Sequence, residues 1–178
     1  MRMTLRGKRF VGAAALAATL AGITVYASFN EPIGSGVMAY SELFGGPATV
    51  LMRRLTIFQG EVLGWHYHPG AGAYTIVTQG TLTVEDGCGF ETVYTTGQAF
   101  LEPPNRVHRG KNLGATDVIT AQTFIVPLGS PTSVSLSGPL CGPPATVNDC
   151  KQGGWQNFNH PLVFESQGTC EQYVITGK

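Results

Sequence analysis

Two histidines one residue apart, His66 and His68, lie in the apolar, glycine-rich stretch "GEVLGWHYHPGAGAYTIVTQG". Residues two apart in a β-strand project to the same face, so this pair would present two imidazoles to one side of a sheet. Buried imidazoles need hydrogen-bond partners or a metal ion. The spacing alone leaves two interpretations open, a metal site and a polar surface face.

A third histidine, His108, lies in "GQAFLEPPNRVHRGKN", in a strand that a hairpin meander can bring beside the first pair. Three histidine ligands with an open coordination position form a catalytic-type site for iron, zinc, manganese, nickel or copper. Spacing does not distinguish these divalent ions. Glu102, at the end of a strand, is a weak candidate for a catalytic base or a replacement ligand, and the competing interpretation is a solvated carboxylate at a strand edge.

Other polar residues give weaker patterns. Arg106 and Arg109 flank His108, where they would either bind an anion or lie exposed on the surface. Gln122 falls on the last candidate strand of the barrel, where an inward amide could orient a bound water.

The aromatic residues beside the histidines are expected to serve packing. Trp65 and Tyr67 alternate with the two histidines and should pack on the opposite face of the strand. His160 precedes Pro161 far from the other histidines and is expected in a turn outside the site. The sequence has no G-x-S-x-G, P-loop or Rossmann fingerprint, which removes the simplest support for serine hydrolysis or nucleotide chemistry.

The elements that must position these side chains are short β-rich runs closed by turn signals. Examples are "AYTIVTQG", "TLTVEDG" and "FETVYTTG", and after the first thirty residues no segment sustains a 3.6-residue apolar period. This pattern predicts an all-β fold, a small antiparallel jelly-roll β-barrel over residues 45–128. Helix is expected to be scarce.

Residues 1–28 have the layout of a signal peptide, with a basic start, an apolar stretch and small residues before a possible cut after Ala27. An uncleaved N-terminal anchor is the alternative, because residues 10–27 approach the roughly 20 apolar residues that span a bilayer. We therefore expect a secreted, periplasmic or cell-envelope protein, with no membrane contact of the mature chain unless this segment is retained.

Charge argues against two kinds of partner. The chain has 11 Lys and Arg and 11 Asp and Glu, and the first 28 residues contain four of the basic residues and none of the acids. Cleavage would therefore leave seven basic and eleven acidic residues, a formal charge of −4 that disfavours nucleic acid. No basic amphipathic helix follows the signal, so a membrane-surface role has no support.

Four cysteines follow the signal, which in an oxidising compartment predicts two disulfides with three possible pairings. A zinc-binding cysteine cluster is the alternative, although no spacing resembles C-x2-C. Residues 129–149 are rich in Pro, Ser and Gly and are interpreted as a segment that wraps the barrel. Residues 150–178 regain aromatics, end in strand-like "CEQYVITG" and are interpreted as a small disulfide-closed appendage.

The first histidine stretch resembles a motif of the cupin superfamily, G-x5-H-x-H-x3,4-E-x6-G. Gly60, His66, His68 and Gly80 match it, whereas Ala73 stands at the Glu position. The resemblance implies a cupin barrel whose three histidines hold a divalent metal ion. Loss of the motif's carboxylate implies a neutral three-histidine site that favours an anionic fourth ligand.

The second motif, G-x5-P-x-G-x2-H-x3-N, is matched by Gly97, Pro103, His108 and Asn112. It departs at the glycine, where Asn105 stands, and asparagine also tolerates a positive φ. Two motifs in order make the resemblance specific over roughly residues 50–141.

More narrowly, the chain is similar to small exported bacterial cupins with a cysteine-bracketed tail. That resemblance implies the pairs Cys88–Cys141 and Cys150–Cys170, and a small-molecule ligand in the barrel. It leaves the role open between an enzyme with dioxygenase-, isomerase- or lyase-like chemistry, a non-catalytic metal- or ligand-binding module, and a structural scaffold of the envelope. Cupin barrels often pair, so the resemblance leaves open whether the chain is a monomer or a homodimer.

Overall fold

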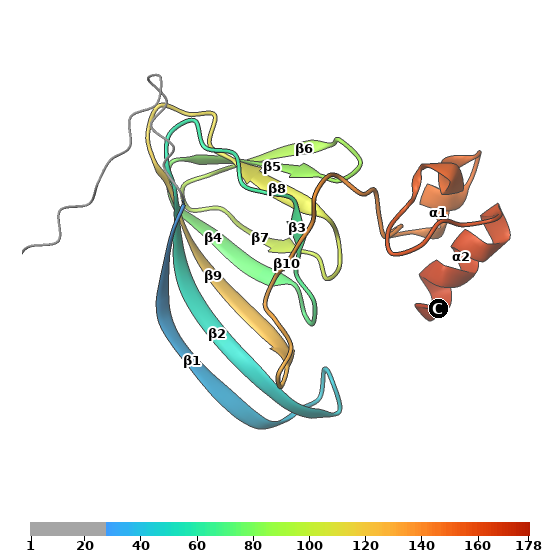
Figure 1. The fold of residues 1–178 in the computed structure, drawn as a ribbon, viewed down its shortest axis with the longest axis horizontal. Helices are drawn as coiled ribbons and strands as arrows, with labels where there is room; N and C mark the ends of the chain where they lie inside the picture. The colour runs from blue at the N-terminus through green and yellow to red at the C-terminus, as the bar shows by residue number, and fades with distance from the viewer. Residues whose placement is uncertain (1–27) are drawn as a thin grey trace, which may run out of the picture.

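The computed structural model describes residues 28–178, which form two five-stranded sheets packed face to face and a small helical appendage beside them (Figure 1). The expected signal segment, residues 1–28, lies outside the described residues except for Ser28. The strands are β1 Phe29–Ser41, β2 Gly46–Ile57, β3 His66–Tyr67, β4 Ala73–Gln79, β5 Thr81–Asp86, β6 Glu91–Thr95, β7 Ala99–Glu102, β8 His108–Lys111, β9 Val118–Pro127 and β10 Val134–Ser135. The prediction of an antiparallel jelly-roll barrel is confirmed.

One sheet has the order β1-β2-β9-β4-β7 and the other β10-β3-β8-β5-β6, with antiparallel pairing throughout. Side chains of β9 alternate between buried and half-buried, as expected of a strand with one face toward the barrel interior. An apolar cluster fills part of that interior between the sheets, made of Leu55, Ile57, Val77, Leu82 and Val118. The polar residues described below occupy another part.

Strand β1 extends the first sheet ahead of the predicted start at residue 45. It pairs with β2 from Phe29 opposite Thr56 to Ser41 opposite Gly46. Its sequence contains Pro32 and two glycines and does not alternate, and nearly all its side chains are exposed. An edge strand paired on one side needs no buried face, which is why the apolar pattern did not reveal it.

The turn between β7 and β8 fits the expectation for Asn105. This residue has φ 60°, the left-handed conformation that the glycine of the motif would supply, and its backbone N–H donates to the carbonyl of His68 at 2.9 Å. The turn is thereby tied to the segment that follows β3. This contact holds Glu102, before the turn, and His108, after it, close to His68.

Residues 129–149 run along the barrel and add a strand to it. β10 pairs with β3, Val134 opposite Tyr67 and Ser135 opposite His66. A disulfide between Cys88, in the β5–β6 hairpin, and Cys141 then ties this segment to the second sheet.

The appendage is helical, so the prediction of a terminal strand is wrong. It contains α1 Val147–Cys150, a 3-10 turn η1 at Gly154–Asn157, and α2 Gln167–Thr176, with the disulfide Cys150–Cys170 at its centre. The hydroxyl of Ser166 caps α2 by accepting from the backbone N–H of Thr169, and Gly177 ends the helix at φ 71°. These caps outweigh the β-branched residues of "CEQYVITG". Neither helix of residues 28–178 is long and apolar enough to cross a membrane.

Candidate metal centre

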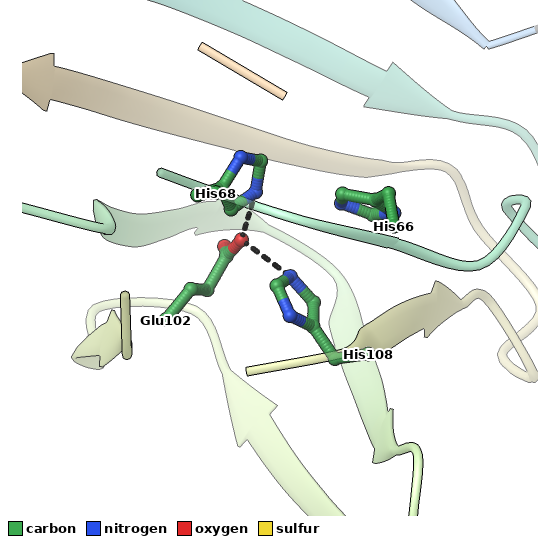
Figure 2. A group of neighbouring side chains, drawn as sticks. All are labelled: His66, His68, Glu102 and His108. Carbon is green, nitrogen blue, oxygen red and sulfur yellow. Dashed lines mark hydrogen bonds and ion pairs between the residues drawn. The ribbon is translucent and has the colours of Figure 1, made fainter. Parts of the chain in front are cut away.

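Three histidines and one glutamate converge in the barrel interior (Figure 2). His66 on β3 lies directly opposite His108 on β8 in the strand pairing. His68 follows β3, and Glu102 ends β7 in the facing sheet. One ligand atom from each of the four residues lies within 4.8 Å of those of the others. The centre therefore combines three nitrogen donors with one carboxylate.

Each of the three imidazoles is oriented by a backbone carbonyl. Nδ1 of His66 is 2.9 Å from the carbonyl oxygen of Gly64, Nδ1 of His68 is 2.7 Å from that of Thr132, and Nδ1 of His108 is 2.8 Å from that of Arg106. A carbonyl oxygen only accepts, so each Nδ1 carries a proton and donates it. The three Nε2 atoms are therefore the ones that face the centre, and in a neutral ring each offers a lone pair.

The carboxylate of Glu102 is held on both oxygens. Oε1 accepts a hydrogen bond from the hydroxyl of Thr75 at 2.6 Å and from the amide of Gln122 at 3.1 Å. Oε2 lies 2.9 Å from Nε2 of His108 and 2.8 Å from Nε2 of His68 (Figure 2). Thr75 and Gln122 thus fix Oε1, while Oε2 is directed at the imidazoles of His68 and His108.

Glu102 lies on the strand beside Ala73, the position where the motif has its carboxylate. Ala73 on β4 is the cross-strand partner of Glu102 on β7, and both are buried, with exposed fractions of 0% and 5%. The interpretation of Glu102 as a solvated edge carboxylate is wrong, and the four-residue centre is not the neutral three-histidine site inferred from Ala73. Alternation along β7 was the available signal, because Glu102 shares a face with the half-buried Phe100.

The pKa values of His66 and His108 shift in opposite directions. Burial, with the neighbouring charge of His108, lowers the pKa of His66 from 6.5 to about 4, so this ring is neutral at ordinary pH. Burial also opposes charge on His108, but its hydrogen bond and charge attraction to Glu102 prevail and raise its pKa above 6.5. The pKa of Glu102 lies well below 4.5 because the contacts with His108 and His68 overcome the effect of its burial. Both shifts favour a buried ion pair between His108 and Glu102, whose Nε2 and Oε2 lie 2.9 Å apart.

The donor set fits a divalent metal ion. Metal–nitrogen and metal–oxygen bonds of about 2.0–2.2 Å place ligand atoms roughly 3–4 Å apart, close to the separations in this centre. Nε2 of His68 is fully buried and lacks an aligned hydrogen-bond partner, although Oε2 of Glu102 lies 2.8 Å away. A divalent ion that binds both atoms would satisfy the buried Nε2 and Oε2 together.

A cavity of about 350 Å³ lies next to the centre. His66, Glu102 and His108 line one part of it, and aliphatic side chains from both sheets line another. Arg53 and Gln122 are among the other polar residues that line it. A small molecule in this cavity would therefore contact both apolar wall and candidate metal ligands.

The remaining predicted residues divide into those near the centre and those engaged elsewhere. Gln122 points inward as expected, but its amide is hydrogen-bonded to Glu102 and Thr75. Arg106 pairs with Asp86 at 2.7 Å and Arg109 with Glu85 at 2.8 Å, so neither guanidinium is free for an anion.

Both aromatic residues beside the histidines pack away from the centre, as predicted. Trp65 lies under the guanidinium of Arg109, 4.4 Å from its ring centre, and Arg109 lies on the face of β8 opposite His108. Trp65 also borders the cavity. Tyr67 points away from the centre and contacts the ring of His160 at 5.2 Å. His160 is outside the site, as predicted.

Comparison with known proteins identifies a domain family for part of the chain. Residues 53–124 match the family model of the cupin domain. Among curated proteins, none matches. Solved structures that resemble the chain include an uncharacterised protein with a double-stranded β-helix domain from Klebsiella pneumoniae subsp. pneumoniae MGH 78578. It has 21% sequence identity and a TM-score of 0.43, and the match covers 60% of this chain and 85% of that one.

Two further structures have the same level of similarity. The protein TT1209 from Thermus thermophilus has 19% identity and a TM-score of 0.43 over 56% of this chain and 83% of that one. An oxalate oxidase in complex with the substrate analogue glycolate has 22% identity and a TM-score of 0.43 over 58% and 55%. These values describe general likeness of fold and assign no activity. Together with the jelly-roll topology, the family match shows that residues 53–124 form a cupin domain.

Proposed function

We propose that His66, His68, His108 and Glu102 bind a divalent metal ion and that the protein is an exported enzyme acting on a small organic molecule in the adjoining cavity. The ion is iron, zinc, manganese, nickel or copper, all of which accept imidazole nitrogen and carboxylate oxygen. One observation carries the proposal: four donor atoms from three strands and one loop lie within 4.8 Å of one another at the wall of a 350 Å³ cavity.

The residues of the centre have separate tasks. The three Nε2 atoms and Oε2 of Glu102 serve as ligands, and the backbone carbonyls that accept from Nδ1 fix the tautomer and the ring planes. Thr75 and Gln122 hold Oε1 and thereby aim Oε2. A divalent ion bound there would supply Lewis-acid chemistry and, if it is redox-active, electron transfer.

Metal content tests the proposal first. Wild-type protein purified under oxidising, metal-replete conditions is compared by elemental analysis with a His66→Ala, His108→Ala double variant. His160→Ala is the matched control, because His160 lies outside the centre. We expect about one equivalent of metal in wild type and control and little in the double variant. Equal metal in wild type and double variant would remove the chemical basis of the proposal.

Turnover is tested next with the metal that the protein retains. For iron, manganese or copper, oxygen consumption is measured against small phenols, thiols and organic acids. For zinc or nickel, loss of the same compounds is followed by chromatography. Full metal loading without turnover of any class would favour a non-catalytic binding module.

Export is a second part of the proposal. Its support is the basic and apolar pattern of residues 1–28 together with the two disulfides, which persist in oxidising compartments. N-terminal sequencing of protein recovered outside the cytoplasm should begin near residue 28. Recovery of the intact N-terminus in the membrane fraction would support the anchor instead.

A further inference from the structure

Arg53 is placed differently from its neighbour Arg54. Both lie on β2, where successive side chains point to opposite faces. Arg54 is exposed and pairs with Glu31 at 2.7 Å. Arg53 points into the barrel, lines the cavity beside the metal centre, and is the cross-strand partner of Gln122 on β9.

The guanidinium of Arg53 is held in position without an ionic partner. Its Nε donates to Oε1 of Gln122 at 2.8 Å, and its central carbon lies 4.7 Å from the ring centre of Phe124. Within residues 28–178, neither Nη1 nor Nη2 has a hydrogen bond or ion pair. The other described arginines each pair with a carboxylate, namely Arg54, Arg106 and Arg109.

This arrangement leaves a fixed cation facing the cavity. Burial lowers the pKa of Arg53, although the charge of Glu102 acts in the opposite direction. An arginine nevertheless stays protonated in proteins, so the charge needs a counter-ion. Glu102 is the nearest candidate, yet both of its oxygens are already engaged by Thr75, Gln122 and the imidazoles. The cavity can therefore accommodate one more anionic group, which the guanidinium of Arg53 would bind.

The rest of the cavity restricts what that anion can be. Its aliphatic wall consists of Leu55, Ile57, Leu63, Leu82, Val84 and Leu136. A single free guanidinium presents two parallel N–H groups, the geometry that matches a planar carboxylate. Apart from the metal centre, the lining of this cavity in residues 28–178 offers no second cation beside Arg53 to hold a phosphate dianion.

We propose that Arg53 binds the carboxylate of a small organic acid, whose apolar body packs on the aliphatic wall while another part of it faces His66, His108 and Glu102. This inference rests on the proposed function, because it makes the acid the ligand of the metal-dependent site. Gln122 is a positioning residue, since its amide holds both Nε of Arg53 and Oε1 of Glu102.

The test measures binding of two acids with an apolar body, benzoate and butanoate, against their uncharged amides, benzamide and butanamide. Isothermal titration is performed on wild type, on Arg53→Gln and on the matched control Arg54→Gln, with the metal content of every sample determined separately. Wild type and Arg54→Gln are expected to prefer at least one acid over its amide. Arg53→Gln is expected to bind that acid about 10- to 100-fold more weakly while its metal content is unchanged.

Two results would overturn the inference: no preference of the wild type for either acid over its amide, or undiminished acid binding by Arg53→Gln. Should that variant fail to fold, Arg53→Lys replaces it, because lysine keeps the charge but loses the planar pair of donors. Undiminished acid binding by Arg53→Lys would then refute the inference. Failure of the metal site appears instead as low metal content in wild type, so the two proposals fail separately.

Discussion

Replacement of Glu102 by alanine should strongly destabilise the metal-free protein. The carboxylate accepts hydrogen bonds from Thr75 at 2.6 Å and Gln122 at 3.1 Å, and it neutralises His108 at 2.9 Å. Glu102 is 5% exposed, as is His108, so water cannot replace these contacts. Removal of one partner of a buried ion pair costs about 3–5 kcal/mol, and we expect Glu102→Ala to lose that much free energy of unfolding.

Urea unfolding followed by circular dichroism measures this loss, at pH 6 with chelator present and disulfides intact. Exposed Glu165 supplies the control, since Glu165→Ala should change the free energy of unfolding by about 0.5 kcal/mol or less. Zinc at about a thousandfold above its dissociation constant should then stabilise wild type by about 4 kcal/mol, and Glu102→Ala by clearly less.

The difference in free energy of unfolding between wild type and Glu102→Ala should depend on pH, and this dependence identifies the ion pair as its source. Because the pKa of Glu102 is lowered, its contribution exists above about pH 4.5 and is lost as pH falls through the folded-state value. Because the pKa of His108 is raised, its contribution exists below about pH 6.5 and is lost as pH rises through the folded-state value. The difference between wild type and Glu102→Ala should therefore be largest between these limits. A loss under about 1 kcal/mol at pH 6, or one independent of pH, would refute the assignment.

Three further outcomes are expected. Addition of Ala73→Glu to the Glu102→Ala variant should restore metal content in elemental analysis. The two positions are cross-strand partners, and Glu102→Ala leaves room for the new side chain. A metal content no higher than that of Glu102→Ala would contradict this. Bound metal should dissociate in equilibrium dialysis as pH falls from 7 to 5, because the raised pKa of His108 lets protons compete; retention at pH 5 would be the contrary result. The double substitution Cys150→Ser, Cys170→Ser should lower the free energy of local unfolding of the appendage by about 3 kcal/mol, measured by hydrogen exchange, and leave the metal content unchanged. Metal loss would instead show that the appendage supports the centre.

The histidines of the centre could be predicted from sequence because their information is local. Strand alternation and two short motifs indicated His66, His68 and His108 before any pairing was known. Asn105 was predictable for the same reason, because its conformation depends on one turn. Such features require no knowledge of which strands are neighbours.

Glu102 could not be assigned in this way because its role depends on register across two strands. The motif expects a carboxylate at position 73, whereas the chain supplies it 29 positions later, on the strand that pairs opposite Ala73. Only the β4–β7 register brings the two positions together. The carbonyl of Thr132, which orients His68, was equally hidden, because it lies in a Pro- and Ser-rich segment without periodicity.

The pair Arg53 and Arg54 illustrates the same limit for the cavity. Alternation requires the two side chains to lie on opposite faces of β2, but it cannot say which one enters the barrel. The β2–β9 register decides, because it sets Arg53 opposite the inward Gln122. Since Gln122 then bonds both Arg53 and Glu102, the same amide supports the cation that faces the cavity and the carboxylate that faces the metal centre. The proposed anion subsite and the proposed metal site would therefore be physically linked, so a ligand that neutralises Arg53 would also change the electrostatic environment of Glu102.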